Sequence, residues 1–188
     1  MIKLILPLMA ALSACASTDS GTPYSNGLPS QENRMEAGHA PTPFSAEEIR
    51  EACTDGAFRL YRLTGEAQPP RMNMSFGPDV EGKVVVTTEI MDEEGAVLGA
   101  SDAPASSWSA FQAHASFPAE RTTITTGTHT TAAGTFDCWT YSVSGPEDTV
   151  TNLVFARDLP GSPLRMVAMK DGTPIQGMEL IDFGPKPR

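Results

Sequence analysis

The sequence has few basic residues for its acidity. Lysine and arginine number 13 against 23 aspartates and glutamates, which gives a formal charge of −10. A nucleic-acid-binding protein needs a lysine- and arginine-rich surface that neutralises phosphates, so this composition argues against nucleic acid as a partner. Electrostatic adhesion to anionic lipid is disfavoured for the same reason.

Residues for catalysis or metal binding are equally scarce. No Gly-x-Ser-x-Gly elbow, phosphate-binding loop or dinucleotide fingerprint occurs. The histidines His39, His114 and His129 lack the close paired spacing that zinc ligands show. Neither Cys53 nor Cys138 has a sequence neighbour that favours a reactive thiolate. We therefore expect a protein that is not an enzyme and has no metal or cofactor.

The N-terminal apolar run is too short to cross a membrane. Residues 4–12 are apolar and uncharged, whereas a spanning helix needs about 20 such residues. Lys3 precedes the run, and the small residues Ser13 and Ala14 follow it. This layout is typical of an export signal that is removed from the mature protein.

Leu12-Ser13-Ala14-Cys15 resembles the lipobox of bacterial lipoproteins. The resemblance implies a signal peptide over residues 1–14 and a diacylated Cys15 that anchors the protein to a membrane. Two acyl chains hold a protein stably, whereas one gives only marginal binding. The family keeps proteins with Asp after the cysteine in the inner membrane, so Ala16 implies the outer membrane, facing the periplasm. The alternative is a plain export signal with a chance cysteine.

Residues 15–43 are rich in Ser, Thr, Gly, Pro and Asn. Such composition buries too little apolar surface to offset ordering entropy, so we expect a flexible tether, or else a segment that folds on a partner. Residues 44–188 are then a single β-rich domain.

Two helices are expected in this domain. Ser45 and Glu48 form a capping box, and Gly56 is the expected C-cap of the first helix. Residues 57–63 favour a strand, although a helix continued to Leu63 is the alternative. The second helix begins at Trp108 after a Ser106 or Ser107 cap and ends before Pro118.

The rest of the domain has strand patterns joined by short turns. Short connections favour an antiparallel sheet, because parallel strands need long crossovers. We expect a mainly β fold of the α+β kind, with a curved or half-barrel antiparallel sheet of about seven to nine strands and two short helices. The further strand candidates are residues 71–76, 83–91, 96–98, 121–131, 135–144, 149–157, 164–170 and 175–183.

Residues 134–143 carry large apolar side chains on both faces of a strand. Alternation places Trp139 and Tyr141 on one face, and Phe136 and Cys138 on the other. This predicts a central strand covered on both sides. Core packing explains the pattern, and the functional alternative is a ligand cavity lined by Trp139, Tyr141 and Trp108.

If Cys15 carries lipid, Cys53 and Cys138 remain as an even pair in an oxidising compartment. A helix packed on the Phe136 face would bring their sulfur atoms together. A disulfide closing so long a loop contributes about 4–5 kcal/mol in the chain-entropy treatment. The sequence favours this disulfide and two separate buried thiols about equally.

Residues 134–141 (Gly-x-Phe-x-Cys-Trp-x-Tyr) and 155–163 (Phe-Ala-Arg-Asp-Leu-Pro-Gly-x-Pro) resemble a group of uncharacterised β-rich exported proteins of proteobacteria. More distantly, the domain is similar to the half-barrels of lipoprotein-localisation factors. That resemblance implies an apolar cavity for acyl chains, but fold does not fix function.

Two functions follow. The first is an envelope lipoprotein that is a non-catalytic binding or structural module, with a membrane contact through its lipid and an envelope protein as partner. The alternative is a module that binds lipid or a small apolar ligand in its curved sheet.

Overall fold

The computed structural model describes residues 27–65 and 70–185. The predicted signal peptide and the predicted lipidation site, Cys15, lie outside the described residues. The helical elements are η2 (Gln31–Asn33), α1 (Ala46–Ala52), α2 (Trp108–Ala113) and η3 (Ala119–Arg121). The strands are β1 (Ala57–Gly65), β2 (Arg71–Phe76), β3 (Lys83–Val84), β4 (Val86–Met91), β5 (Val97–Asp102), β6 (Ser106–Ser107), β7 (Thr122–Thr131), β8 (Gly134–Ser144), β9 (Thr149–Ala156), β10 (Arg165–Lys170) and β11 (Thr173–Pro185).

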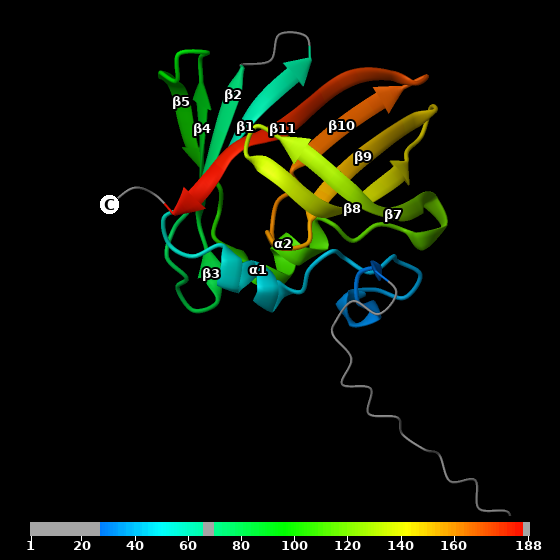
Figure 1. The fold of residues 1–188 in the computed structure, drawn as a ribbon. Coiled ribbons are helices and arrows are strands. Elements are labelled where there is room, and N and C mark those ends of the chain that lie inside the picture. The colour runs from blue at the N-terminus through cyan, green and yellow to red at the C-terminus, as the bar shows by residue number, and fades with distance from the viewer. Residues whose placement is uncertain (1–26, 66–69, 186–188) are drawn as a thin grey trace, which may run out of the picture.

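Nine strands form one antiparallel sheet in the order β5-β4-β2-β1-β11-β10-β9-β8-β7 (Figure 1). The order contains two meanders, β1-β2-β4-β5 and β7 to β11, which join where β1 pairs with β11. β3 and β6 form a separate two-stranded sheet. The predicted mainly β architecture with two short helices is therefore confirmed.

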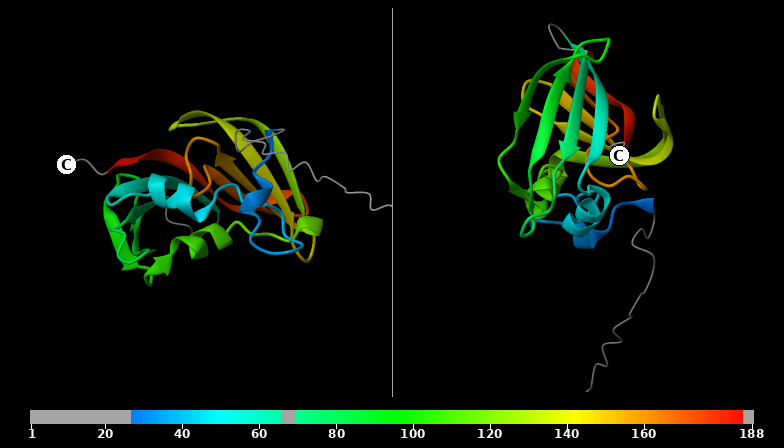
Figure 2. Two further views of the ribbon diagram at one scale, coloured as in Figure 1. Left: turned by 90° about the horizontal axis from the view of Figure 1, so that it is seen from below. Right: turned by 90° about the vertical axis from the view of Figure 1, so that its left-hand side faces the viewer.

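The sheet is strongly curved, and α1 and α2 lie side by side at one end of it (Figures 1 and 2). The β7–β8 hairpin curls back toward β11. His129 of β7 and Glu179 of β11 approach to 3.7 Å between Nε2 and Oε1. The curvature thus brings β7, the first strand of its meander, toward β11 at the centre of the strand order.

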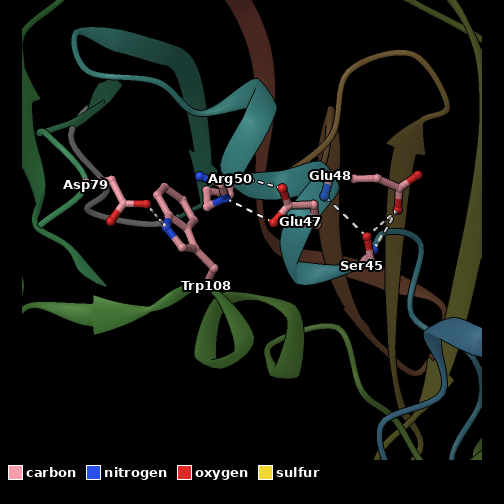
Figure 3. A network of polar contacts seen from close by, with 6 residues as sticks. All are labelled: Ser45, Glu47, Glu48, Arg50, Asp79 and Trp108. Carbon is pink, nitrogen blue, oxygen red and sulfur yellow. Dashed lines mark hydrogen bonds and ion pairs between the residues drawn. The ribbon is translucent and has the colours of Figure 1, made fainter. Parts of the chain in front are cut away.

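The predicted capping box starts α1 (Figure 3). Ser45 Oγ accepts from the Glu48 N–H at 3.2 Å, and the Ser45 N–H donates to Glu48 Oε2 at 2.7 Å. The expected C-cap at Gly56 was wrong, because the helix ends earlier with Cys53 as its C-cap. Gly56 instead donates its N–H to Phe76 O at 2.8 Å and leads into β1. Residues 57–65 are a strand, so the alternative of a longer helix is also wrong.

The expected single strand over residues 83–91 is interrupted at Val85. Val84 is buried and pairs with Ser106, whereas Val86 pairs with Phe76 in the main sheet. The valine run has strong β propensity on both sides of the break. Two different pairing partners therefore divide it, which local propensity does not reveal.

Residues 27–43, part of the segment predicted to be a flexible tether, pack on the domain. Ala40 and Thr42 are buried there. Tyr141 Oη donates to Pro41 O at 2.7 Å, and Trp139 Nε1 donates to Gly27 O at 2.8 Å. The buried aromatic side chains need acceptors for their polar ends, and this segment supplies them. We call residues 27–44 the strap.

Two hydrophobic clusters form the core. The first lies between the helices and the sheet and includes Trp139, Tyr141 and Cys53. The second is built around Tyr61 and Leu180 on β1 and β11 and includes Cys138. The predicted division of residues 134–143 into two faces is borne out by this grouping. β8 lies next to the edge strand β7, however, rather than at the centre of the sheet.

The predicted disulfide between Cys53 and Cys138 is absent, and both are free, buried thiols. α1 packs on the Trp139 side of β8, not on the Phe136 side as the pairing required. The two cysteines therefore belong to different clusters. The alternative of two separate buried thiols is confirmed.

Candidate functional site: an apolar pocket under the helices

An apolar pocket of about 220 Å³ lies between the two helices and the sheet. It draws its walls from α1, α2, β2, β9, β10, β11 and the β9–β10 loop, so segments far apart in the sequence contribute to it. The lining residues are Ile49, Phe76, Phe111, His114, Ala115, Leu153, Phe155, Gly161, Ser162, Pro163, Met166 and Met178.

Helix α2 forms one wall. Ser107 caps the helix, because its Oγ accepts from the Ala110 N–H at 3.2 Å. Phe111 and Ala115 are four residues apart, so they share one side of the helix and its C-terminal turn and both reach the pocket. Ile49 of α1 reaches the same space, and Phe111 stacks at a tilt against Phe76 with 6.3 Å between ring centroids.

The β9–β10 loop forms another wall, and its approach to α1 depends on Gly161. This glycine has φ +115°, a conformation that side chains with a Cβ rarely adopt. A Cβ at this position would lie 3.1 Å from Cys53 Sγ. Glycine therefore permits both the backbone turn and the close contact between loop and helix.

The lining of the pocket is mostly apolar. Met166 and Met178 supply flexible, polarisable side chains that adapt to irregular apolar shapes. Among the described lining residues, His114 is the one ionisable side chain, and it is exposed at the rim. The arrangement suits the binding of an apolar group and places no carboxylate or nucleophile against it.

None of the three aromatic residues predicted to line a cavity lines this pocket. Trp108, Trp139 and Tyr141 lie in the core beside the lining residues. Trp108 contacts Phe111 at 5.8 Å and Tyr141 contacts Phe155 at 5.4 Å, both between ring centroids. They therefore support the pocket from one layer behind it.

The polar atoms of these aromatic residues are used to hold other segments. Trp108 Nε1 donates to Asp79 Oδ2 at 2.9 Å, which ties α2 to the β2–β3 connection (Figure 3). The guanidinium carbon of Arg157 lies 5.2 Å from the Trp139 ring centroid. Arg157 Nη2 also donates to Gly27 O, which is the acceptor of Trp139 Nε1 as well. Sequence periodicity placed these residues on apolar faces. Whether a residue lines a cavity depends on whether the packed side chains leave empty space beside it, which the sequence pattern does not show.

The two thiols have little nucleophilic character. Burial raises the pKa of the Cys53 thiol, and nearby Arg59 lowers it by less. Burial also raises the pKa of the Cys138 thiol, against a smaller opposing effect of the His129 backbone N–H. Both groups are protonated at neutral pH, and the thiol is a far weaker nucleophile than the thiolate.

The three histidines lie in different surroundings. His39 Nδ1 is 2.8 Å from Ser116 Oγ, whereas His129 approaches Glu179 and His114 packs edge-on against Phe111. Across the part of the chain with described structure, no three His, Cys, Asp or Glu side chains group around a point where one ion would fit. Within residues 27–65 and 70–185, no helix has the length and apolar character needed to cross a bilayer.

No protein-family model matches the chain, and no curated protein matches it in sequence. Among solved structures, MucB in complex with MucA(peri) is similar at a TM-score of 0.51 with 13% identity, over 74% of this chain and 54% of that chain. MucB alone gives a TM-score of 0.50 at the same identity, over 76% of this chain and 58% of that one. This chain therefore shares a fold with MucB and corresponds to little more than half of its length.

A candidate lipoprotein of Parabacteroides distasonis is also similar, with a TM-score of 0.42, 10% identity and coverage of 70% of this chain and 96% of that chain. A candidate exported protein of Bacteroides fragilis with a YmcC-like fold gives a TM-score of 0.43, with the same identity and coverage. The comparisons thus establish structural similarity to exported and lipoprotein-like bacterial proteins and to MucB.

Proposed function

We propose that the protein is a non-catalytic binding module of the bacterial cell envelope that holds one apolar group in the pocket beneath α1 and α2. The observation that carries this proposal is the pocket itself, with its apolar wall and a single ionisable residue at the rim. Pockets that bind small molecules are mostly apolar with few polar groups, which is the composition found here.

The size of the pocket limits the ligand. Pockets for drug-sized molecules have volumes of about 300–1,000 Å³. The pocket of about 220 Å³ is smaller, so it accommodates part of a ligand rather than a whole lipid. A stretch of acyl chain fits this volume, and His114 at the rim is placed where the polar end of such a ligand would meet water.

The location in the envelope rests on residues 12–15 and on the fold. Acylation of Cys15 would hold the domain at the periplasmic face of the outer membrane, where acyl chains are abundant. The strap would start twelve positions after this anchor, at Gly27. A Cys15→Ala variant is expected to leave the membrane fraction, and membrane retention without an acyl mass on Cys15 would overturn the anchor.

Binding of decanoate by the full chain, measured by isothermal titration calorimetry, tests the pocket. Ala115→Trp places an indole inside the pocket and is expected to weaken binding at least tenfold. Ala113→Trp is the matched control, because Ala113 is exposed on the same helix and does not line the pocket. Equal binding by both variants and the unchanged protein would reject the pocket as the ligand site.

A protein partner is the second candidate. MucB, which shares the fold, was solved in complex with MucA(peri). A partner's apolar side chain is another group of the right size for the pocket. If decanoate does not bind but a partner from the envelope binds the unchanged chain and the Ala113→Trp variant, and not the Ala115→Trp variant, this second function is favoured.

A further inference from the structure

Strand β5 forms an open edge of the sheet. It lies at the end of the strand order, next to β4 alone among the strands that the structure describes. All six of its residues are exposed. Val97 is 52% exposed and Leu98 65%, and they alternate between the two faces of the strand. The edge therefore combines unpaired backbone groups with apolar side chains on both faces.

Several of the usual protections of an edge strand are missing from β5, although a register shift interrupts its pairing with β4 at Met91. Natural edge strands carry lysine or proline, or are covered by other elements. Residues 97–102 contain neither of these residue types. At the opposite edge, β7 curls back toward β11 and its His129 contacts Glu179. Among the described strands, β7 is also paired on one side only and is mostly exposed, but it is rich in threonine, whereas β5 exposes the large apolar side chains Val97 and Leu98.

The hairpin that carries β5 is strongly acidic. Residues 84–120 contain no lysine or arginine. Five of the carboxylates in this segment belong to the β4–β5 hairpin, although Arg62 of β1 and Arg71 of β2 line the same hollow as two of them, Glu93 and Glu94. The five are Glu89, Asp92, Glu93, Glu94 and Asp102. Glu89 accepts from Asn73 of β2, on the side of β4 away from β5, whereas Glu93 and Glu94 stand in the turn and Asp102 ends β5. A strand that pairs with β5 would therefore meet negative charge mainly at the two ends of β5.

We propose that β5 binds an extended, basic segment of a partner protein, which adds to the sheet as a tenth strand. Added strands gain affinity from main-chain hydrogen bonds and specificity from alternating side chains. The valines of an alternating strand share one face, so they would pack on either Val97 or Leu98, which lie on opposite faces of β5. The lysine or arginine side chains on the other face would reach the hairpin carboxylates. A second copy of this chain is a poor occupant, because two such acidic hairpins repel each other. This surface is separate from the apolar pocket.

An octapeptide of alternating lysine and valine, labelled and blocked at both ends, is the probe. Fluorescence anisotropy with the full chain is expected to give binding at least tenfold tighter than for the matched glutamate–valine octapeptide. Binding should weaken as sodium chloride is raised, because exposed charges are screened. Amide hydrogen exchange should slow in residues 97–102 on binding and stay unchanged in residues 122–131.

Two sets of variants locate the interaction. Glu93→Lys with Glu94→Lys is expected to weaken peptide binding about fivefold to tenfold, whereas Glu51→Lys with Glu120→Lys changes the total charge equally at exposed positions elsewhere and should change binding less than twofold. Successive N–H groups of an antiparallel strand point to opposite neighbours. Of the variants Gly99→Pro and Ala100→Pro, one therefore removes a backbone N–H that points away from β4, toward the added strand. That variant should lose peptide binding while keeping its circular dichroism spectrum.

Several outcomes overturn the proposal. They are equal binding of the two octapeptides, exchange protection outside β5, equal effects of the two charge-reversal pairs, and formation of a dimer protected at β5 in place of peptide binding. The decanoate experiment is unaffected by all of them, so failure of this surface and failure of the pocket are distinguishable.

Discussion

The two ends of the sheet differ in how they are covered. In β8, one strand from the β7 edge, Cys138, Trp139 and Tyr141 are all buried. In β5, at the other edge, every residue is exposed. Both strands belong to one continuous antiparallel sheet, but β8 has a strand on each side, whereas β5 has one neighbour among the described strands. The difference therefore reflects the position of each strand together with what packs on it, since the strap and the helices cover β8.

Coverage at the β8 end includes the strap. Phe44 at the end of the strap packs edge-on against Trp139, with 5.8 Å between ring centroids. Gln112 of α2 donates to Asn33 O at 3.2 Å and to Thr42 Oγ1 at 3.0 Å. The strap thus joins helix and strand and covers the β8 end, whereas β5 at the other end is exposed.

The largest loss of stability is expected from truncating one side chain at the covered end of the sheet. Trp139→Ala should lower the free energy of unfolding by about 3–5 kcal/mol, because it leaves a cavity in the first cluster. Urea denaturation followed by far-UV circular dichroism measures the change. Trp139→Phe keeps much of the volume and should cost less, and a loss below about 1 kcal/mol for Trp139→Ala would contradict the role of this end as the core.

The pocket wall should be sensitive at Gly161. Gly161→Ala is expected to cost about 1–3 kcal/mol, because a strained φ is combined with a close contact to Cys53 Sγ. Gly172→Ala is the matched control, since Gly172 also has positive φ but open space around it. Thermal unfolding of both variants separates the contact from backbone strain, and equal losses would show that the contact with Cys53 has no cost.

The strap contact at Tyr141 should have a smaller, pH-dependent effect. Tyr141→Phe leaves Pro41 O without its donor and should cost about 1 kcal/mol. Burial raises the pKa of Tyr141. Stability from the neutral folded phenol is therefore fully present below the unfolded pKa of about 10 and is lost as pH rises above it.

Urea denaturation between pH 8 and 11 checks this sign. The unchanged protein should lose stability above about pH 10, and the Tyr141→Phe variant should lose less over the same interval, because it removes one titrating group. Parallel declines in both proteins would place the pH dependence elsewhere.

The smallest effect is expected at the open edge. Leu98→Ala removes an exposed side chain and should change the free energy of unfolding by less than about 0.5 kcal/mol. The same denaturation measurement used for Trp139→Ala gives a direct comparison. A loss above 1 kcal/mol at Leu98 would mean that β5 is covered in solution, which would remove the distinction between the two ends.

Local sequence signals determined most of the secondary structure. Ser45 and Glu48 satisfy the free N–H groups of a helix start, and they did so as expected. Ser107 capped the second helix, and residues 92–95 formed the predicted hairpin turn before β5. These devices act between residues a few positions apart, so the sequence contains all the partners that they need.

Tertiary structure decided what the long-range contacts would be. Alternation along β8 separated Cys138 from Trp139, but it did not say on which side α1 would pack, and that choice left the two cysteines unbridged. The polar strap looked unstructured because its stabilising partners, Trp139, Tyr141 and Gln112, lie about 70–110 positions away.

The pocket is the clearest case of a feature that the sequence alone does not predict. Phe111 and Ala115 have the four-residue spacing of one helix face, which the sequence shows, whereas no local pattern links Met166 and Met178 to them. A cavity is space that side chains from several elements leave unfilled, and its position depends on how closely those elements pack. The sequence therefore determined the elements and their apolar faces, while the distances between packed elements decided where a ligand would fit.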